Sequence, residues 1–400
     1  MKKIFSPQDK VIANSDKVLE FLKTGNTAPV LVELDPSNTC SQGCVFCISS
    51  YIHLDESKNL STFNRSIMSR DMLLNVCKDC IDLGVRALTA TGGGEPLVNK
   101  HLPEAIEYVK NNSDIKLGMF TNGTLIEQRK AFEILVDCMT WVRISIDSGT
   151  RETYNRIRRP RTEDQNFDGM WKNLIKLLET REKRNSKTMI GVGYVITPDN
   201  YREIVDFANM FKDLDVDYCQ YKPEIVNQER DEGIQREAIF WKEKVEPLIS
   251  EAKIILGDKF QINGYKLTDL IEDPTLLGRH YKKCLGSQIQ PCIGADGEIY
   301  ICVNQRGYKD YSYGSLYDKS FKDIWNDMNS RNEVRWKIDE RDLFCNCTSL
   351  CKPSESNKIF YDISQKWNSL SDTGKAEYET QLLQIEMPLA RENTEHWEFI

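Results

Sequence analysis

Residues 30–47 read Val30-Leu-Val-Glu-Leu-Asp-Pro-Ser-Asn-Thr-Cys40-Ser-Gln-Gly-Cys44-Val-Phe-Cys47, an apolar run followed by a loop with three cysteines. The apolar, β-rich residues 30–34 predict a strand. The three thiols therefore share one loop that directly follows a strand, and Gly43 would allow that loop a tight backbone. Three thiolates are one ligand fewer than a closed zinc or iron–sulfur site needs.

Two interpretations of the triplet stay open on the residues alone. A four-iron cluster held by three cysteines would leave one iron free to bind a small molecule. A structural zinc ion completed by His53 or by a distant cysteine is the alternative. Disulfides are less expected, because the start of the sequence, MKKIFSPQDK, has no apolar stretch typical of an export signal.

Composition narrows the class of protein. The sequence has 400 residues, of which 40% are hydrophobic and 28% charged, as in soluble globular proteins of more than one domain. A net charge of −8 argues against non-specific binding to nucleic acid or an anionic membrane. No apolar run approaches the roughly 18 residues of a membrane span. We therefore expect a cytoplasmic protein without a nucleic-acid or membrane partner, whose 13 cysteines, an odd number, cannot all pair internally.

Short β-rich runs alternate with amphipathic runs from residue 30 to about 225. Strands are expected at Val30–Leu34, Ala87–Thr91, Lys116–Thr121, Val142–Asp147, Met189–Thr197 and Asp217–Lys222, and helices at about 70–83, 101–112, 124–137, 165–182 and 199–214. This alternation predicts an α/β fold with a parallel sheet or barrel. Six strands are too few for a complete eight-stranded barrel, so we expect an open, partial (β/α)6 TIM-like barrel.

The rest of the sequence divides into four segments around a barrel at 29–228. Residues 1–28 predict a helical N-terminal extension, and 229–283 a mostly helical connection. Residues 284–351 hold six cysteines and predict a small C-terminal domain. Residues 352–400 contain nine acidic and five basic residues, which predicts a solvated, helical or partly disordered acidic tail.

The triplet Cys40, Cys44 and Cys47, with the aromatic Phe46 before its third cysteine, resembles the signature of the radical S-adenosylmethionine (radical SAM) family. The resemblance extends over about residues 30–225. It implies that the three cysteines hold a [4Fe–4S] cluster whose open iron binds S-adenosylmethionine (SAM), with Phe46 beside the cofactor.

The segment Thr91-Gly-Gly-Gly-Glu-Pro96 ends the second predicted strand. Its three glycines free the backbone for close approach to a ligand. The segment resembles the element with which radical SAM enzymes hold the methionyl amino group. The resemblance implies this role for Gly93, Gly94 and Glu95, with Gly92 as a possible helper.

Polar residues also end the third and fourth predicted strands. Asn122 follows the third, and Arg143, Ser145 and Asp147 share one face of the fourth. The resemblance implies that Asn122 and Ser145 contact the cofactor, with Ser145 on the ribose. Asp147 either joins them or caps the next helix.

Three further features have two interpretations each. Gly191 and Gly193 inside the fifth strand indicate close packing or ligand approach, and loosely resemble the adenine-contacting element of the family. Lys222 shares a face with Gln220 and either meets substrate or forms a surface ion pair. The five arginines between 151 and 161 either form a solvated loop paired with acidic neighbours (Glu152 and Glu163) or receive a carboxylate or phosphate.

The second cysteine region resembles the SPASM/Twitch auxiliary-cluster domain of radical SAM enzymes. Cys284 is followed by twelve residues, Gly297, four residues and Cys302, and an Asp-Gly turn predicts a hairpin between Cys292 and Cys302. Fewer cysteines follow than in a full SPASM domain, so one auxiliary [4Fe–4S] cluster is expected. Its expected ligands are Cys284 and Cys302 with two of Cys345, Cys347 and Cys351, one of which Cys292 could replace.

A structural zinc ion remains the alternative for this second region. The other four cysteines, at 77, 80, 138 and 219, are expected in the core. The four histidines form no catalytic pattern.

The resemblance implies an enzyme that reductively cleaves SAM to a 5′-deoxyadenosyl radical, which removes a hydrogen atom from substrate. An electron donor such as flavodoxin or ferredoxin is implied. The N-terminal 28 residues offer little room for a peptide-recognition domain, which favours oxidation or rearrangement of a small molecule. A peptide-modifying maturase is the alternative within the family, and a non-catalytic zinc-binding module is the alternative outside it. The polar loop Ser50–Arg70 could cover either substrate.

Overall fold

A computed structural model describes residues 7–47, 49, 66–224, 238–262, 281–339, 351, 353–392 and 399. His53, most of the Ser50–Arg70 loop, Cys345 and Cys347 lie outside these described residues. None of the described helices is long and apolar enough to cross a membrane.

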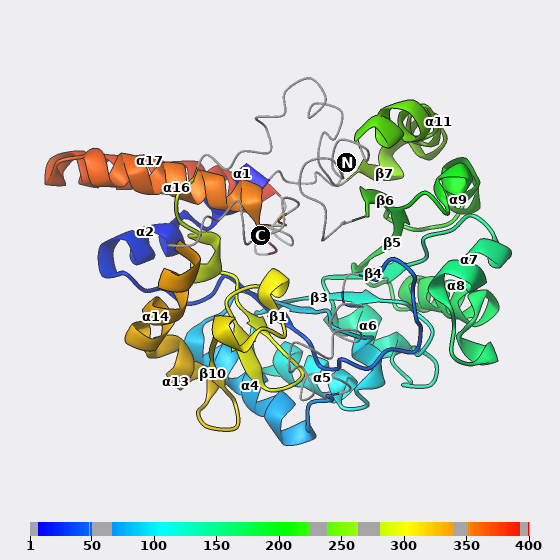
Figure 1. Cartoon of the computed structure of the whole chain (residues 1–400), viewed down its shortest axis with the longest axis horizontal. Coiled ribbons are helices and arrows are strands. Elements are labelled where there is room, and N and C mark those ends of the chain that lie inside the picture. The colour runs from blue at the N-terminus through cyan, green and yellow to red at the C-terminus, as the bar shows by residue number, and fades with distance from the viewer. Residues whose placement is uncertain are drawn as a thin grey trace.

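One open, ten-stranded sheet organises the described chain (Figure 1). Its order is β10-β9-β8-β1-β2-β3-β4-β5-β6-β7, and β1 to β7 run parallel. The parallel strands are β1 Leu31–Leu34, β2 Ala87–Ala90, β3 Lys116–Thr121, β4 Trp141–Ser145, β5 Met189–Ile196, β6 Tyr218–Pro223 and β7 Phe260–Ile262. The partial barrel predicted from the sequence is confirmed, with β7 as a short strand that the prediction missed.

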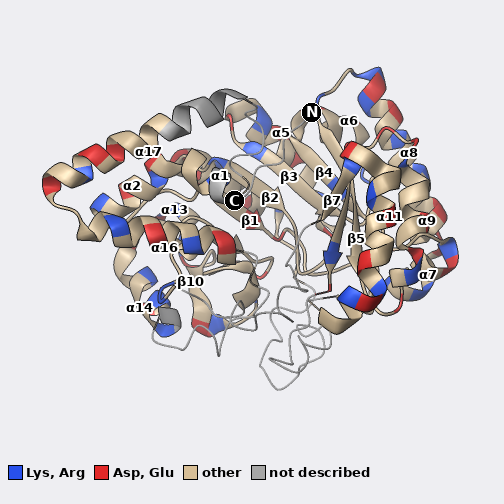
Figure 2. Ribbon diagram, turned by 90° about the horizontal axis from the view of Figure 1, so that it is seen from above, with Lys and Arg blue, Asp and Glu red and all other residues tan. Residues whose placement is uncertain are grey.

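Helices cover the outer face of this sheet (Figure 1). They are α4 Arg70–Leu83, α5 Leu102–Asn112, α6 Phe132–Cys138, α7 Arg151–Arg158, α8 Phe167–Lys183, α9 Ile204–Phe211 and α11 Glu246–Leu256. Strand residues that point outward, such as Met119, Val142 and Ile144, are fully buried beneath them. Acidic and basic residues are interspersed along the helices (Figure 2).

Most helix ends agree with the sequence, and the differences have local causes. Helix α4 has the expected bounds, because Ser69 caps its first turn and Gly84 takes a left-handed conformation after its last. Helix α6 begins at Phe132 rather than 124, because turns occupy the preceding residues and Lys130 has a positive φ of 51°. Helix α7 occupies the arginine-rich segment that the sequence predicts as a possible solvated loop.

The inner face of the sheet explains the two glycines of β5. A Cβ at Gly191 would collide with the ring of Tyr218, and Gly118 on β3 lies equally close to Trp141. Tyr218 and Trp141 belong to a small inner cluster that also includes Phe399. Close packing, one of the two interpretations of Gly191 and Gly193, therefore accounts for Gly191.

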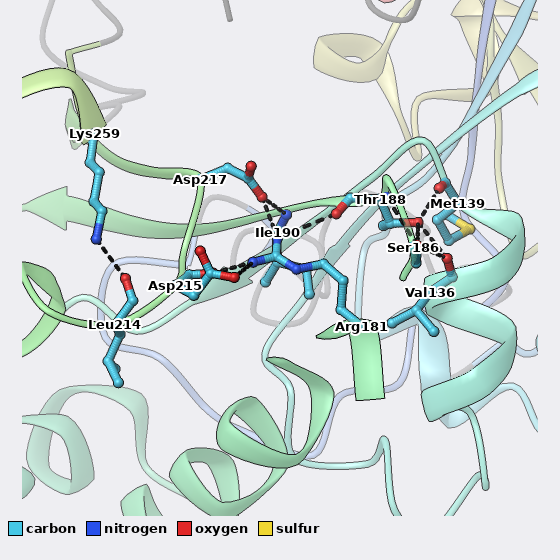
Figure 3. A network of polar contacts seen from close by, with 10 residues as sticks. All are labelled: Val136, Met139, Arg181, Ser186, Thr188, Ile190, Leu214, Asp215, Asp217 and Lys259. Carbon is cyan, nitrogen blue, oxygen red and sulfur yellow. Dashed lines mark hydrogen bonds and ion pairs between the residues drawn. The ribbon is translucent and has the colours of Figure 1, made fainter. Parts of the chain in front are cut away.

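A network of polar contacts joins the segments before strands β5 and β6 (Figure 3). Arg181 of α8 pairs with Asp215 and Asp217, and it is almost fully buried. The hydroxyl of Thr188 donates to the carbonyl oxygens of Val136 and Met139, at 2.7 Å each. These contacts join the segments before β5 and β6 to each other and to the end of α6, at the edge of the sheet opposite the cysteine loop.

The auxiliary hairpin continues the sheet of the barrel. Strand β8, Cys292–Ile293, pairs in parallel with β1, and antiparallel β9, Glu298–Tyr300, and β10, Ser312–Ser315, follow. The predicted Asp-Gly turn is present, with Gly297 at a φ of 81°. Helices α13 Phe321–Asn326 and α14 Met328–Asp339 pack against β10. The second cysteine region thus rests directly on the first strand of the barrel.

The two ends of the chain pack together. Helices α1 Pro7–Ala13, α2 Ser15–Thr24, α16 Ser354–Ser369 and α17 Asp372–Glu392 share contacts (Figure 1). Their core contains Val18, Phe360, Ile363 and Trp367. The tail is helical, as expected. Helix α16 is not solvated, because apolar residues spaced three and four apart form a buried face on it, whereas most described residues of α17 are exposed.

Candidate metal centre

The loop after β1 brings three thiols together. Cys40, Cys44 and Cys47 are all partly exposed and carry no disulfide. Burial, together with the charges of Glu95, Cys44 and Cys47, raises the pKa of Cys40 to about 12. Burial also raises the pKa of Cys44, to about 11. Iron binds the thiolate, so loading of this loop with metal would release protons.

The donor chemistry of this loop suits an iron–sulfur cluster. In the described part of the chain, no three His, Cys, Asp or Glu side chains are arranged to hold one metal ion. A zinc ion lies about 2.3 Å from each thiolate, whereas a four-iron cluster spans a wider body and keeps its cysteines further apart. The donor set on this loop is sulfur only, which is the chemistry that iron–sulfur clusters use.

Helix α7 supports the cysteine loop from below. The Gly43 amide donates to the Arg158 carbonyl at 3.0 Å, and the Val45 amide donates to the Ile157 carbonyl at 2.9 Å. The Arg161 amide donates to the Ser41 carbonyl at 3.1 Å. Because the last carbonyls of a helix have no intrahelical partner, they are free to take these bonds. The arginine-rich segment therefore positions the loop that carries the thiols.

Arg158 places a buried positive charge beside the thiols. Its guanidinium pairs with Asp147, and its Nε donates to Gln42 Oε1 at 2.8 Å. Burial alone would lower the pKa of Arg158, but the charges of Cys44 and Asp147 outweigh burial and raise it. Sequence reasoning singled out Arg158 only as one of five arginines, and it missed Gln42. The available signal was the spacing of Tyr154, Ile157 and Arg158, which share the buried face of α7.

The other arginines of this segment behave as surface residues. Arg151 pairs with Asp168 and Arg156 with Asp199, and both arginines are exposed. The expected partners Glu152 and Glu163 are not the ones used. The prediction of a solvated segment therefore describes Arg151 and Arg156 but is wrong for Arg158.

Asp147 has a different role from capping the next helix. Its backbone has a positive φ of 61°, and its carboxylate accepts from the Val195 amide at 2.6 Å besides pairing with Arg158. The cap of α7 is Thr150, which accepts from the Thr153 amide. The capping alternative for Asp147 is therefore wrong.

The glycine-rich loop after β2 lies against the cysteine loop. The Glu95 amide donates to the Thr39 carbonyl at 3.0 Å, and a Cβ at Gly94 would collide with the same carbonyl. The Gly93 amide donates to the buried carboxylate of Asp35. At Gly94, the close approach that the glycines allow is therefore made by the backbone of Thr39.

Glu95 is buried at the junction of three strand ends. Its carboxylate accepts from the Thr121 hydroxyl at 2.6 Å, from the Asn122 amide at 2.7 Å and from the Leu97 amide at 3.2 Å. Burial raises the pKa of Glu95, and these hydrogen bonds oppose that rise. The residue therefore ties β2 to β3 beside the thiols.

The remaining predicted cofactor residues surround the same loop. The side-chain nitrogen of Asn122, Nδ2, donates to Ser41 Oγ at 2.8 Å and lies 3.9 Å from Cys40 Sγ. Ser145, at the end of β4, is partly exposed, and so is Phe46 next to Cys47. The structure thus brings the strand ends of β1 to β4 to one edge of the sheet, as parallel strands require.

The second cysteine region gathers around Tyr313. Burial raises the pKa of the Tyr313 hydroxyl, and the charges of Cys284 and Cys302 raise it further, against the effect of nearby arginines. Cys351 Sγ accepts from the Asn304 amide nitrogen at 3.7 Å. Cys292 is fully buried and lies 4.0 Å from Asp35 Oδ2. Cys77, Cys80 and Cys219 are buried in the core, as predicted, and Cys138 is packed at its border.

Family models match both cysteine regions. The model described as the radical SAM superfamily matches residues 34–208, and the one described as an iron–sulfur cluster-binding domain, SPASM, matches residues 284–352. Together they span more than half of the chain. The first therefore covers the thiol loop and the second the region around Tyr313.

Several curated proteins are similar to this chain. The molybdenum cofactor biosynthesis protein moc-5 of Caenorhabditis elegans is 29% identical over 46% of this chain and 28% of its own length. Fe-coproporphyrin III synthase of Methanosarcina barkeri is 22% identical over 78% of this chain and 76% of its own. GTP 3′,8-cyclase of Clostridium perfringens SM101 is 25% identical over 57% of this chain and 65% of its own length. The chain thus spans little more than a quarter of the first of these relatives.

A solved structure has a similar fold. Streptococcus suis SuiB bound to S-adenosylmethionine has a TM-score of 0.55 and 16% identity over 85% of this chain and 76% of SuiB. The proteins of these two domain families work with a [4Fe–4S] cluster, SAM and an auxiliary iron–sulfur cluster. With its thiol loop at the end of β1 and its second cysteine region on β8, this chain belongs to the radical SAM superfamily and carries a C-terminal SPASM domain.

Proposed function

We propose that the thiols of Cys40, Cys44 and Cys47 hold the SAM-binding cluster and that the protein uses it to remove a hydrogen atom from a small-molecule substrate. The observation that carries the proposal is the convergence of three partly exposed thiols beside the buried cation of Arg158. When bound and reduced, the cluster supplies the electron that splits SAM into methionine and a 5′-deoxyadenosyl radical. Flavodoxin or ferredoxin is the proposed electron donor.

The chain's own residues would orient the SAM molecule. Gly93, Gly94 and Glu95 lie beside the thiol loop, where they can face the methionyl amine. Ser145 is partly exposed at the end of β4 and offers its hydroxyl to the ribose. Phe46, next to Cys47, would limit water at the cofactor.

Asn122 and Asp147 act on the site through other residues. Asn122 holds the side chain of Ser41, next to Cys40, through a hydrogen bond from its side-chain amide to Ser41 Oγ. Asp147 holds the guanidinium of Arg158 next to Cys44. Substitution of either residue would therefore change the position of the thiols rather than remove a ligand of SAM.

The second region would hold one auxiliary cluster, with Cys284 and Cys302 as ligands, joined by two of Cys345, Cys347 and Cys351, one of which Cys292 could replace. Strand β8 pairs with β1, so this cluster would lie next to the barrel. It would either accept an electron from the substrate, which makes the net reaction an oxidation, or anchor the substrate for a rearrangement.

A small molecule is the favoured substrate. Two relatives, Fe-coproporphyrin III synthase and GTP 3′,8-cyclase, are named for small molecules. The first described helices, α1 and α2, pack against α16 and α17, so these two helices do not form a separate peptide-recognition domain. A peptide is the second candidate, because SuiB bound to its precursor peptide SuiA has a similar fold, with a TM-score of 0.54.

The test is an anaerobic reaction of the reconstituted, reduced protein with SAM and deuterated candidate substrates, followed by mass spectrometry of 5′-deoxyadenosine. The proposal expects deuterium transfer from a small molecule. Transfer from a peptide alone would favour the maturase. A colourless protein with stoichiometric zinc and no cleavage of SAM would instead favour a zinc-binding module.

A further inference from the structure

Arg143 lies on the inner face of the barrel. It occupies the third position of β4, and its neighbours Val142 and Ile144 point to the opposite face and are fully buried beneath the helices. Arg143 is partly exposed, and so are Phe120 beside it on β3 and Ser145 two residues further along β4. Solvent therefore reaches this face of the strands between the thiol loop and the inner aromatic cluster.

The guanidinium crosses one strand to reach the next. Its Nη1 donates to Oε1 of Gln220 on β6, on the far side of β5. The strand between them carries Gly193 at this point, where a Cβ would lie 3.5 Å from the Arg143 Nε. The guanidinium also lies over the ring of Phe120, 4.1 Å from the centroid. A Cβ at Gly193 would make an ordinary van der Waals contact, so the guanidinium lies directly over the backbone of this residue.

Arg143 forms no ion pair with a described carboxylate, although an arginine offers five donors. The charge of Asp147 acts on its guanidinium without direct contact. The buried Nε of Arg143 has no hydrogen-bond partner among the described residues. Three other buried arginines are paired: Arg158 with Asp147, Arg181 with Asp217 and Arg306 with Asp35. Arg331 and Arg335 have no described carboxylate partner either, and among the described residues Arg335 donates only to Asn332 and to the Cys284 carbonyl.

Arg331 is the informative comparison, because it too has no carboxylate among the described contacts. Its guanidinium instead donates to Asn26, to the Trp325 carbonyl and to Gln288. Arg143 has one amide acceptor, from Gln220. A guanidinium that has lost part of its hydration and has so few protein acceptors would be stabilised by an anion.

We propose that Arg143 binds an anionic group of the substrate, a carboxylate or a phosphate, inside the barrel. The inference rests on the proposed function, because it places the substrate on the inner face below Ser145. Ser145 lies two positions after Arg143, a distance of about 6.6 Å along β4. An anionic group bound at Arg143 would thus direct the neutral part of the substrate toward Ser145, where SAM is proposed to bind. Gln220 holds the guanidinium in this position and leaves its other donors to the ligand.

The test measures binding without chemistry. Reconstituted, unreduced protein with SAM is titrated with ¹³C-succinate and, separately, with inorganic phosphate, and NMR line broadening gives the affinity. Succinamide is the neutral control. We expect one of the two anions to bind and succinamide not to bind, and the anion that binds identifies the group that the site recognises.

Variants separate recognition from folding. Arg143→Gln should weaken anion binding at least fivefold, Arg143→Lys should retain part of it, and Arg184→Gln should leave it unchanged, because Arg184 pairs with Asp137 on the outer surface. Binding of neither anion to the unaltered protein, or equal binding to Arg143→Gln, would overturn the proposal. If SAM is not cleaved but anion binding still depends on Arg143, the proposed function fails while this assignment stands.

A purely structural Arg143 would behave differently. If the guanidinium only bridges Phe120 and Gln220, Arg143→Gln would have a lower unfolding temperature than the unaltered protein. Succinate or phosphate would not change the difference between these two temperatures. The unfolding temperature is therefore measured with and without the anion that binds. Stabilisation of the unaltered protein and of Arg143→Lys, but not of Arg143→Gln, would support the proposal.

Discussion

The carboxylate of Asp35, at the end of β1, pairs with the guanidinium of Arg306, 271 residues further along the chain. Both side chains are buried, and the same carboxylate accepts from the Gly93 amide. Asp35 therefore joins the barrel, the glycine-rich loop and the SPASM domain at one point. Breaking this contact should affect both cysteine regions at once.

Arg306→Met should lower the free energy of unfolding by about 3–5 kcal/mol, because it leaves the buried carboxylate of Asp35 without its cation. Denaturant unfolding measures the change. Lys322→Met is the control, since Lys322 pairs with an exposed Asp82 and should change stability by less than about 1 kcal/mol. Asp35→Asn combined with Arg306→Met should cost less than the sum of the single changes. Additive costs would contradict a direct interaction.

Gly94→Ala should abolish SAM binding, because a Cβ at this position collides with the Thr39 carbonyl and would separate the glycine-rich loop from the thiol loop. Gly43→Ala is the matched control on the thiol loop. A Cβ there would meet Arg159 at an ordinary 3.9 Å, and Gly43 is not among the residues with positive φ. Equilibrium dialysis with labelled SAM compares the two variants. Equal affinity in both would contradict the proposed role of the loop.

Arg158→Gln should destabilise the protein by roughly 3 kcal/mol and reduce iron at the thiol loop, because Asp147 and Gln42 both lose their partner. Arg156→Gln, on the exposed side of the same helix, should change neither property. Iron analysis after anaerobic reconstitution gives the readout, with about eight irons expected when two four-iron clusters fill. Full iron content in Arg158→Gln would show that the guanidinium does not support the loop.

Asp296→Asn should make the protein more stable at neutral pH. Burial raises the pKa of Asp296 from 3.8 to about 6, against the hydrogen bond from Tyr300. The folded state therefore favours the protonated form of Asp296. The contribution of this protonated carboxyl to the free energy of unfolding is fully present below pH 3.8 and is lost as the pH rises through 6. The advantage of Asn should grow from near zero at pH 4 to roughly 2 kcal/mol at pH 7.5. A difference that stays constant with pH would contradict this assignment.

Periodicity in the sequence predicts the parallel strands and the long helices, because their buried faces repeat at the expected spacing. It misses β7, which has three residues and forms only against its neighbour β6. It also misses α7, since the arginines around Ile157 and Arg158 hide the buried face of that helix. The packing of α16 is missed for a similar reason, because its charge suggests a solvated segment.

The site was predictable where it depends on spacing along the chain. Three cysteines within eight residues share a loop in any fold, so their convergence could be expected. The pairing of Arg158 with Asp147 and of Arg306 with Asp35 depends on how distant segments meet. Gly43 illustrates the opposite error, because the sequence suggests a tight backbone where the structure has room for a side chain.

The central claim is that Cys40 belongs to the cluster that activates SAM. The most direct measurement is 5′-deoxyadenosine formation by anaerobically reconstituted, dithionite-reduced protein, with Cys40→Ala beside the unaltered chain. The account predicts formation by the unaltered protein and none by Cys40→Ala, which should keep about four irons in the SPASM domain. Cleavage of SAM by Cys40→Ala at the unaltered rate would contradict it.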